Sequence, residues 1–366
     1  MSDQFTGRRR RQSTVSVARV VALVVAFAVV AWLLALGEPA RQAQSGAPPI
    51  TIAAPTWAGP KPVDVPGVLA DGATYTPRLY LDARTSVGVA TGADGTVRVI
   101  LVSANGSFTE LRRRPPADYA QFNGFATDGT TLVWMETVSR NGSASHSLWS
   151  AKWSSAGTPT ALVSNAGDPR FAGLSTDVVI SAGKVMWASD AAGHTDIRQV
   201  ALTGGRVTSA RWLDGEFALS APPYAVTTPG GPVNFMNIAT GESFRVLVGP
   251  GEVAVCDPTW CRVTVTENGT LAGIDLMHTD GSQRTRIAGG ESTPTITDPT
   301  MLDRFVPLAT DRSGGVGLNL YDLRTGRTDL VAPAAANVGG RNGILWWSTG
   351  TGAELVWHAV DLRELA

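Results

Sequence analysis

The chain has little lysine and almost no net charge. Of its 30 basic residues only three are lysines, and 31 acidic residues balance them to a formal net charge of -1 at pH 7. A protein that binds the phosphate backbone of a nucleic acid is normally basic. The composition therefore argues against a nucleic-acid partner.

The sequence also lacks the motifs of several enzyme classes. It contains no Gly-x-Ser-x-Gly elbow, which excludes an ordinary α/β-hydrolase nucleophile, and no Gly-x-x-x-x-Gly-Lys phosphate loop. Its four histidines show no His-Glu-x-x-His pairing, so we predict neither a metal nor a cofactor. Beyond residue 37 no stretch has convincing helical periodicity, which argues against an α/β fold.

What the chain has in plenty is turn glycine at regular intervals. Alternating strands flank a tight Gly-containing turn at intervals of 36 to 51 residues, and the turn glycines are Gly106, Gly157, Gly205, Gly241, Gly281 and Gly326. A repeat of this length with several short strands per unit is typical of a β-propeller. We predict an all-β propeller of seven four-stranded blades, or six if the terminal units merge. The closing strand would come from residues 63–69 or from the extreme C-terminus.

One repeat also resembles a known family. Residues 125–134 combine a short strand, the Asp128-Gly129 turn and an apolar strand ending in Trp134, and residues 184–210 follow the same order. This resembles the repeat of TolB-type β-propellers. Only Asp128-Gly129 keeps the second half of that family's Ser-Pro-Asp-Gly turn. The resemblance implies a propeller, and similar repeats serve Tol–Pal envelope complexes, peptidase-associated domains and bacterial surface proteins.

The N-terminal part of the chain has the pattern of a membrane anchor. Residues 8–11 are four arginines, and residues 20–36 are 17 consecutive apolar residues. A helix of that length spans about 25 Å, close to the ~30 Å hydrocarbon core. A cleaved export signal and a buried globular helix are the alternatives.

The positions of these segments predict a topology. Because basic residues stay on the cytoplasmic side, we predict a cytoplasmic tail over 1–16 and a single transmembrane anchor over 17–37. A Pro-rich linker would follow over 38–66, with an extracytoplasmic propeller over 67–366. The protein would then be a single-pass protein of the cell membrane.

The only cysteines, Cys256 and Cys261, flank a four-residue turn. Outside the cytoplasm such a pair oxidises, so we predict a disulfide that staples a hairpin. A redox-active pair would be expected as Cys-x-x-Cys, and a zinc site would need two further ligands.

Several charged residues lie near the loops that would join second and third strands. These loops gather on one face of a propeller, and we take them as the candidate binding face. The candidate residues are Arg140, His146, Asp190, His194, Asp196, Asp311 and Arg312. A shared metal site for His146 and His194, or a Ca²⁺ loop at residues 190–196, is the sharper alternative.

The tryptophans follow the repeat as well. Trp134, Trp187 and Trp346 or Trp347 recur in the apolar second strand, which predicts packing between blades. Trp149, Trp153 and Trp357 would lie on third strands, where a carbohydrate-stacking surface is the alternative.

Together these features favour a membrane-tethered binding or scaffold module for an envelope protein partner. The alternative is an extracytoplasmic hydrolase or lyase that acts on a polysaccharide or lactone at the propeller axis. A third alternative is a sensor, although the short cytoplasmic tail holds no folded output domain. Fold alone does not decide between these classes.

Overall fold

The computed structural model describes residues 57–153, 157–227, 232–312 and 315–365. The predicted tail, the predicted anchor and residues 38–56 of the predicted linker lie outside these ranges. Within them, η1 (Pro116–Asp118), η3 (Gly352–Glu354) and η4 (Leu362–Leu365) are short 3-10 helices. None of the described helices is long and apolar enough to cross a membrane.

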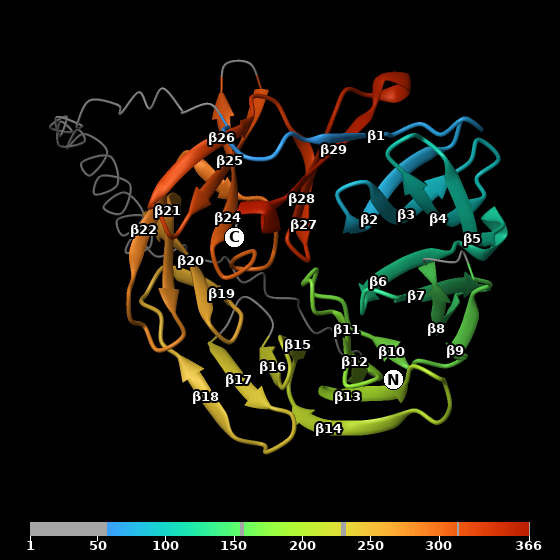
Figure 1. Ribbon diagram of the computed structural model, residues 1–366. Coiled ribbons are helices and arrows are strands. Elements are labelled where there is room, and N and C mark those ends of the chain that lie inside the picture. The colour runs from blue at the N-terminus through green and yellow to red at the C-terminus, as the bar shows by residue number, and fades with distance from the viewer. Residues whose placement is uncertain (1–56, 154–156, 228–231, 313–314, 366) are drawn as a thin grey trace, which may run out of the picture. The chain divides into compact units, whose positions relative to one another are not determined.

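The described residues form seven antiparallel sheets arranged in a ring (Figure 1), which confirms the predicted all-β propeller of seven blades. Blade 1 contains β2 (Thr74–Asp82), β3 (Thr85–Thr91), β4 (Val97–Ser103) and β5 (Phe108–Arg114). Blade 2 contains β6 (Gln121–Thr127), β7 (Thr131–Arg140), β8 (Ser143–Lys152) and β9 (Thr160–Val163). Blade 3 contains β10 (Asp168–Pro169), β11 (Val178–Ser181), β12 (Lys184–Ala191), β13 (His194–Ala201) and β14 (Thr208–Asp214).

The remaining blades follow the same meander. Blade 4 contains β15 (Phe217–Leu219), β16 (Tyr224–Thr227), β17 (Val233–Asn237) and β18 (Ser243–Val246). Blade 5 contains β19 (Glu252–Cys256), β20 (Trp260–Glu267), β21 (Thr270–His278) and β22 (Thr285–Gly289). Blade 6 contains β23 (Ser292–Pro294), β24 (Phe305–Arg312), β25 (Gly315–Asp322) and β26 (Arg327–Ala332). Blade 7 contains β27 (Ala336–Arg341), β28 (Ile344–Thr349), β29 (Val356–Asp361) and the N-terminal β1 (Val63–Pro66).

The ring is closed by the two ends of the described chain. Strand β1 pairs antiparallel with β29, with Val63 opposite Ala359. Of the two predicted sources of the closing strand, this pairing shows that residues 63–69 supply it and the extreme C-terminus does not, and it leaves no open edge at the seam. The ring therefore begins before residue 67, because four residues assigned to the linker are a strand of blade 7. Trp57 also packs against the core between blades 6 and 7.

The hydrophobic core is divided among the seven junctions between neighbouring blades. Trp134 is buried between blades 1 and 2, Trp187 between blades 2 and 3, Trp346 between blades 7 and 1, and Trp347 between blades 6 and 7. The second strands therefore pack as the tryptophan pattern predicted. Of the third-strand rings, Trp357 is 2% exposed and cannot offer a stacking surface. The ring of Trp149 is covered by the guanidinium of Arg112, 3.6 Å from the ring centroid.

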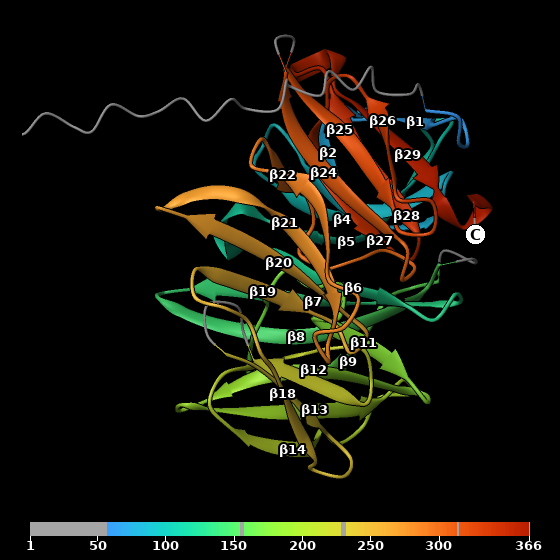
Figure 2. The ribbon, with the colours of Figure 1, turned by 90° about the vertical axis from the view of Figure 1, so that its left-hand side faces the viewer.

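The two faces of the ring follow from the strand order. Turns between the first and second strands and between the third and fourth strands lie on one face, here called the pocket face. Hairpins between the second and third strands lie on the opposite face, together with the connections between blades. Figure 2 shows the strands running between these two faces. The predicted turn glycines all fall between third and fourth strands, on the pocket face.

Blade 3 departs from the four-strand pattern. Its innermost strand is broken into β10 and β11, which both pair with β12. Residues 170–177 separate the two pieces, and we call them the axial loop because they contact blades on the far side of the ring.

Candidate functional site

The structure places all seven residues of the predicted binding face inside strands, so the prediction that they occupy loops is wrong at this level of detail. Strands were longer than expected because the hairpins between second and third strands are tight. Arg140 and His146 are in blade 2, Asp190, His194 and Asp196 in blade 3, and Asp311 and Arg312 in blade 6.

Most of these side chains have local partners. Arg140 donates to Asp118 through Nε at 2.8 Å, and His194 Nδ1 lies 2.9 Å from Asp214. Asp196 is buried and accepts hydrogen bonds from Arg198 at 2.8 Å and Ser209 at 2.6 Å.

The remaining four are spread over separate blades. The Thr137 hydroxyl lies 2.9 Å from His146 Nδ1, and Arg312 lies 3.4 Å from the Asn319 side chain. Asp311 is exposed. Asp190 accepts a hydrogen bond from Arg170 at 2.8 Å and so touches the start of the axial loop. The structure does not gather the seven residues into one site.

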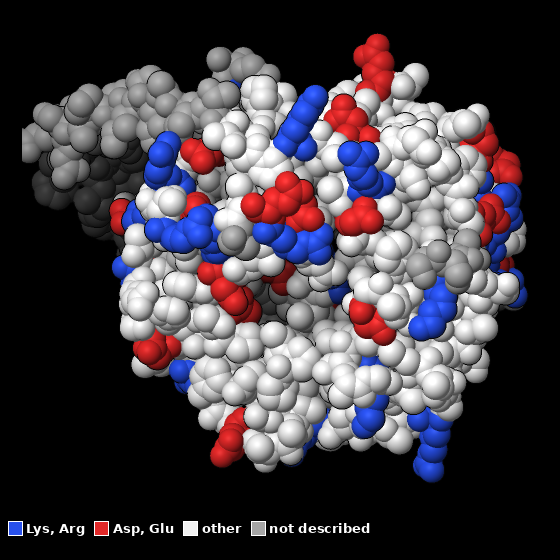
Figure 3. Space-filling view, in the orientation of Figure 1, with Lys and Arg blue, Asp and Glu red and all other residues white. Residues whose placement is uncertain are grey.

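A pocket with a volume of about 350 Å³ opens instead near the ring axis on the other face. Its walls come from the loops between the first and second strands of blades 4 to 7, and its floor from residues 174–176 of the axial loop. Figure 3 shows a hollow near the centre of the ring with acidic side chains beside it. Residues from five blades thus meet in this axial pocket.

The floor of the pocket is held by a network of buried polar contacts. Ser175 donates to the Asp298 carboxylate through its amide at 3.2 Å and its hydroxyl at 3.0 Å. Arg341 of blade 7 donates to the carbonyls of Ser175 and Val178. Thr176 donates to the Leu219 carbonyl of blade 4 at 2.8 Å. The axial loop is therefore tied to blades 4, 6 and 7, and it crosses the channel that a propeller otherwise leaves along its axis.

Burial shifts the pKa values of the charged groups in this network. Burial raises the pKa of the Asp177 carboxyl to about 6, although the Ala172 and Gly173 amides donate to it at 2.9 Å. Burial also raises the pKa of Asp298. The pKa values of Arg262 and Arg341 are lowered by burial to about 10. Both guanidiniums stay charged at neutral pH and balance the two carboxylates that they face.

The mouth of the pocket is acidic. Asp257 accepts hydrogen bonds from the Thr259 and Trp260 amides, both at 2.7 Å, which fixes the tip of its hairpin. Burial raises the pKa of Asp257, and the neighbouring carboxylates of Asp303 and Asp298 raise it further. Asp257 and Asp303 form no ion pair within the described residues. The mouth therefore attracts a cation.

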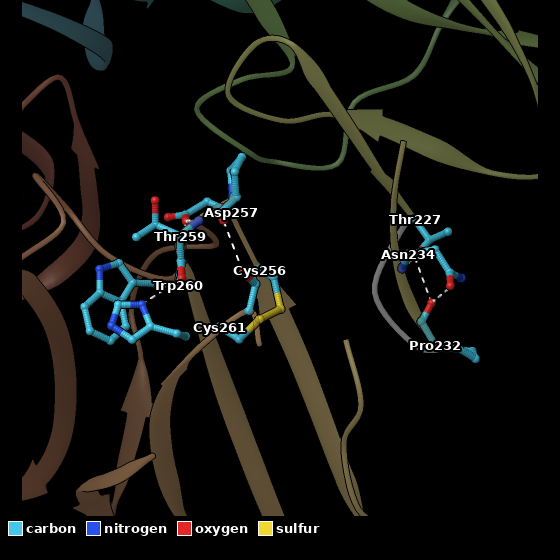
Figure 4. The surroundings of a disulfide bond; sticks show 11 residues. Thr227, Pro232, Asn234, Cys256, Asp257, Thr259, Trp260 and Cys261 are labelled. Carbon is cyan, nitrogen blue, oxygen red and sulfur yellow. Dashed lines mark hydrogen bonds between the residues drawn. A yellow bond between two sulfur atoms is a disulfide. The ribbon is translucent and has the colours of Figure 1, made fainter. Parts of the chain in front are cut away.

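The hairpin that carries Asp257 is closed by the predicted disulfide. Cys256 and Cys261 are opposite each other in β19 and β20, and their sulfurs are bonded. Figure 4 shows the disulfide below the tip formed by Asp257 and Thr259. The structural role predicted for the cysteines is confirmed, and the bond fixes one wall of the axial pocket.

A second hollow of about 420 Å³ lies beside the first, between blades 5 and 6. Its lining combines apolar and polar side chains, the polar ones including Gln283 and Thr285. The apolar side chains belong to Trp260, Leu276, Ile287, Tyr321 and Leu323. Arg304 and Arg324 lie at the rim. Asp303 lines both hollows, and we call the two adjacent hollows together the groove.

The turn at the junction of the two hollows is strained. Leu302 and Asp303 have φ angles of 56° and 52°, and the Arg304 amide donates to the Met301 carbonyl at 3.1 Å. A turn with two left-handed central residues favours Asn-Gly or Asp-Gly, as at Asn268-Gly269. Left-handed backbone costs roughly 1–2 kcal/mol for an ordinary side chain.

This groove was not predicted from the sequence, because the candidate residues all came from the hairpins of the opposite face. Two signals in the sequence pointed to it. Asp257-Pro258 directly follows the first strand of blade 5, and Asp298-Pro299 lies in the loop after the first strand of blade 6. The loop over 295–304 is also long for a connection within a blade.

The groove offers binding chemistry. Within the described residues, the axial pocket has serine and threonine hydroxyls but no histidine or lysine that could activate them. No group of three or more His, Cys, Asp or Glu among the described residues could hold a metal ion.

Comparison with known proteins establishes the fold. No protein-family model matches the chain, and no curated protein matches it in sequence. A solved acylaminoacyl peptidase, in complex with Z-Gly-Gly-Phe-chloromethyl ketone, matches with a TM-score of 0.51 and 12% identity, over 79% of this chain and 52% of the peptidase. The chain thus spans about half the length of that enzyme. An uncharacterized protein from Listeria monocytogenes EGD-e matches with a TM-score of 0.51 and 10% identity, over 82% of this chain and 95% of that one.

TolB from Acinetobacter baumannii is also matched, at 13% identity and a TM-score of 0.36, over 75% of this chain and 79% of TolB. The two matches with a TM-score of 0.51 show the fold alone, and the TolB match, at 0.36, carries no argument. The propeller that the TolB resemblance implied is confirmed by the ring itself.

Proposed function

We propose that this protein is a membrane-tethered, extracytoplasmic binding module that presents the axial pocket to an envelope protein partner. The observation that carries the proposal is the pocket itself. It is built by loops from five blades, it has an acidic mouth, and its floor is closed by the axial loop. A largely preformed concave site with a few convergent polar groups is the usual form of a binding site.

Two observations favour binding over the hydrolase or lyase alternative. No histidine or lysine is among the described residues that line the pocket, and the carboxylate beside one of its hydroxyls, Asp298, already accepts a hydrogen bond from Ser175. The buried carboxylates of Asp177 and Asp298 are already engaged by backbone amides and Ser175. At the mouth, Asp303 forms no ion pair among the described residues, and Asp257 accepts its two amide hydrogen bonds through Oδ1 alone, so these two carboxylates are the ones that can meet a ligand.

The membrane tether rests on the sequence. The apolar run over 20–36, with arginines before it, would hold the ring outside the cytoplasm. Oxidation of Cys256 and Cys261 agrees with an oxidising compartment. Deleting residues 17–37 should release the protein from the membrane fraction, and finding the intact chain soluble in the cytoplasm would end this part of the proposal.

The binding role is tested by cross-linking in intact cells and affinity purification of the full-length protein. The comparison is with an anchor-and-linker protein that lacks residues 67–366, and with the full chain carrying Asp257→Asn and Asp303→Asn. The matched control is Asp214→Asn, whose carboxylate is 94% exposed at the end of β14. We expect a partner that is enriched with the wild type and the control and is lost from the other two. Equal recovery with the anchor-and-linker protein would refute a binding role for the ring.

A further inference from the structure

The axial pocket and the hollow between blades 5 and 6 differ in character along one groove. At the axis, Asp257 and Asp303 supply negative charge without a cation among the described residues. Beyond Asp303 the lining includes apolar side chains, with the ring of Trp260 stacked on His278 at 4.0 Å between centroids. The groove thus has an acidic end, a partly apolar middle and a basic rim.

The basic rim contains one engaged and one free arginine. Arg304 is held by Asp322 at 2.8 Å and covers the ring of Phe305. Arg324 is exposed, and its guanidinium forms no ion pair in the described part of the chain. Arg324 would repel a second basic group at this end of the groove and attract an acidic one.

The strained turn sits where the two hollows meet. Leu302 is 42% exposed although it is a large apolar residue in left-handed backbone. Backbone strain of this kind persists when the surrounding structure holds it, and it gathers at ligand sites. Here it places the Leu302 side chain and the Asp303 carboxylate at the groove surface.

We propose that the groove binds an extended peptide segment of the partner, with a basic side chain in the axial pocket and an apolar side chain in the hollow between blades 5 and 6. This inference rests on the proposed function and specifies the chemistry of the partner. In an extended peptide, alternate side chains point to the same side. The basic and apolar residues are therefore separated by one or three residues, and an acidic residue beyond the apolar one would meet Arg324.

The test uses fluorescein-labelled Gly/Ser dodecapeptides and the purified ring in fluorescence anisotropy. One series carries Lys and Phe separated by one, two or three residues. The comparison peptides replace Lys by Glu or Phe by Gly, and one peptide adds Asp after Phe. We expect the Lys and Phe peptides with one or three intervening residues to bind most tightly. Either replacement should raise the dissociation constant about tenfold or more, which corresponds to the loss of roughly one favourable contact.

The protein variants locate the site. Asp303→Asn should weaken binding of the Lys peptide about tenfold but should not weaken binding of the Glu peptide, because it removes a like charge. Arg324→Gln should weaken only the peptide with Asp. Leu302→Asn with Asp303→Gly relieves the turn and removes the charge, so loss of binding by this variant at unchanged or higher thermal stability would come from the missing charge and not from misfolding. Asp214→Asn on the opposite face is the matched control.

Three results would overturn the proposal. They are equal binding of the Lys and Glu peptides, equal loss with Asp214→Asn and Asp303→Asn, or no binding of any peptide at millimolar concentration. Capture of a partner in cells that is insensitive to Asp303→Asn would also overturn it, while leaving the proposed binding role in place. Capture of no partner by the ring would count against the binding role first.

Discussion

One turn on the pocket face differs in sequence from the two-residue hairpins of the opposite face, although both have left-handed backbone. On the opposite face, hairpins between second and third strands close with two-residue turns such as Asn141-Gly142 and Asn268-Gly269, whose left-handed backbone suits these residues. On the pocket face, Asn342-Gly343 forms a turn of the same kind, but the turn at Leu302-Asp303 uses left-handed backbone with an unsuitable sequence.

The two faces also differ in whether their charged side chains have ion-pair partners. On the opposite face, Arg140 meets Asp118 and Arg170 bridges Asp190 and Glu216. At the mouth of the axial pocket, Asp257 and Asp303 meet no cation among the described residues. Natural proteins retain strain and unpaired charge mainly where function requires them. The difference supports the proposal that the pocket face carries the binding site.

The largest change in stability is expected from removing a buried charge from the pocket floor, a change with no equivalent among the exposed charges of the opposite face. Arg341→Met takes away the cation that faces Asp177 and Asp298 and leaves two carbonyls without their donor. We expect the free energy of unfolding to fall by about 3–5 kcal/mol, because two carboxylates lose the nearby compensating charge and two carbonyls lose their donor. Urea denaturation followed by tryptophan fluorescence measures this change.

The control is an exposed arginine near the opposite face. Arg113, at the end of β5, is 53% exposed and pairs with Glu110. Arg113→Met should cost no more than about 1 kcal/mol. Similar losses for the two variants would show that the axial loop is not held by its buried contacts.

The disulfide gives the next largest effect. Replacing both cysteines by alanine opens a short loop at the pocket face, and the chain-entropy model predicts a loss of about 2 kcal/mol. The hairpin at the other end of β20 closes at Asn268-Gly269 without such a bond. Denaturation of the wild type with and without dithiothreitol is the comparison, and the reduced wild type should approach the variant. A variant as stable as the oxidised wild type would contradict the prediction.

The smallest effect has the opposite sign. Leu302→Asn with Asp303→Gly gives the strained turn a sequence that its backbone favours, so the free energy of unfolding should rise by about 1–2 kcal/mol. Ala192→Asn on the opposite face relieves only one left-handed residue, since Gly193 already follows it, and should add less than about 1 kcal/mol. Thermal unfolding of both variants checks which one gains more stability. A lower stability of the variant with Leu302→Asn and Asp303→Gly would show that packing of the Leu302 side chain outweighs the strain of its backbone.

The sequence by itself determined the ring. The spacing of the turn glycines, from Gly106 to Gly326, located the turn between the third and fourth strands in six successive blades. The closing strand near Val63 and the Cys256–Cys261 bond were also readable, because each depends on a local pattern or on two nearby residues. Period-2 alternation and tight turns are local properties, and local patterns carry them.

Only the tertiary structure decided the site. Asp177, Asp298 and Arg341 lie far apart in the chain and meet because the ring closes and because the axial loop leaves blade 3 to cross the channel. No local pattern marks a charge whose partner is on another blade. The residues chosen from sequence, such as Arg140 and His194, lie beside short hairpins whose charges find partners close by. Convergence at a ring axis depends on long-range closure, and the order of residues along the chain does not reveal it.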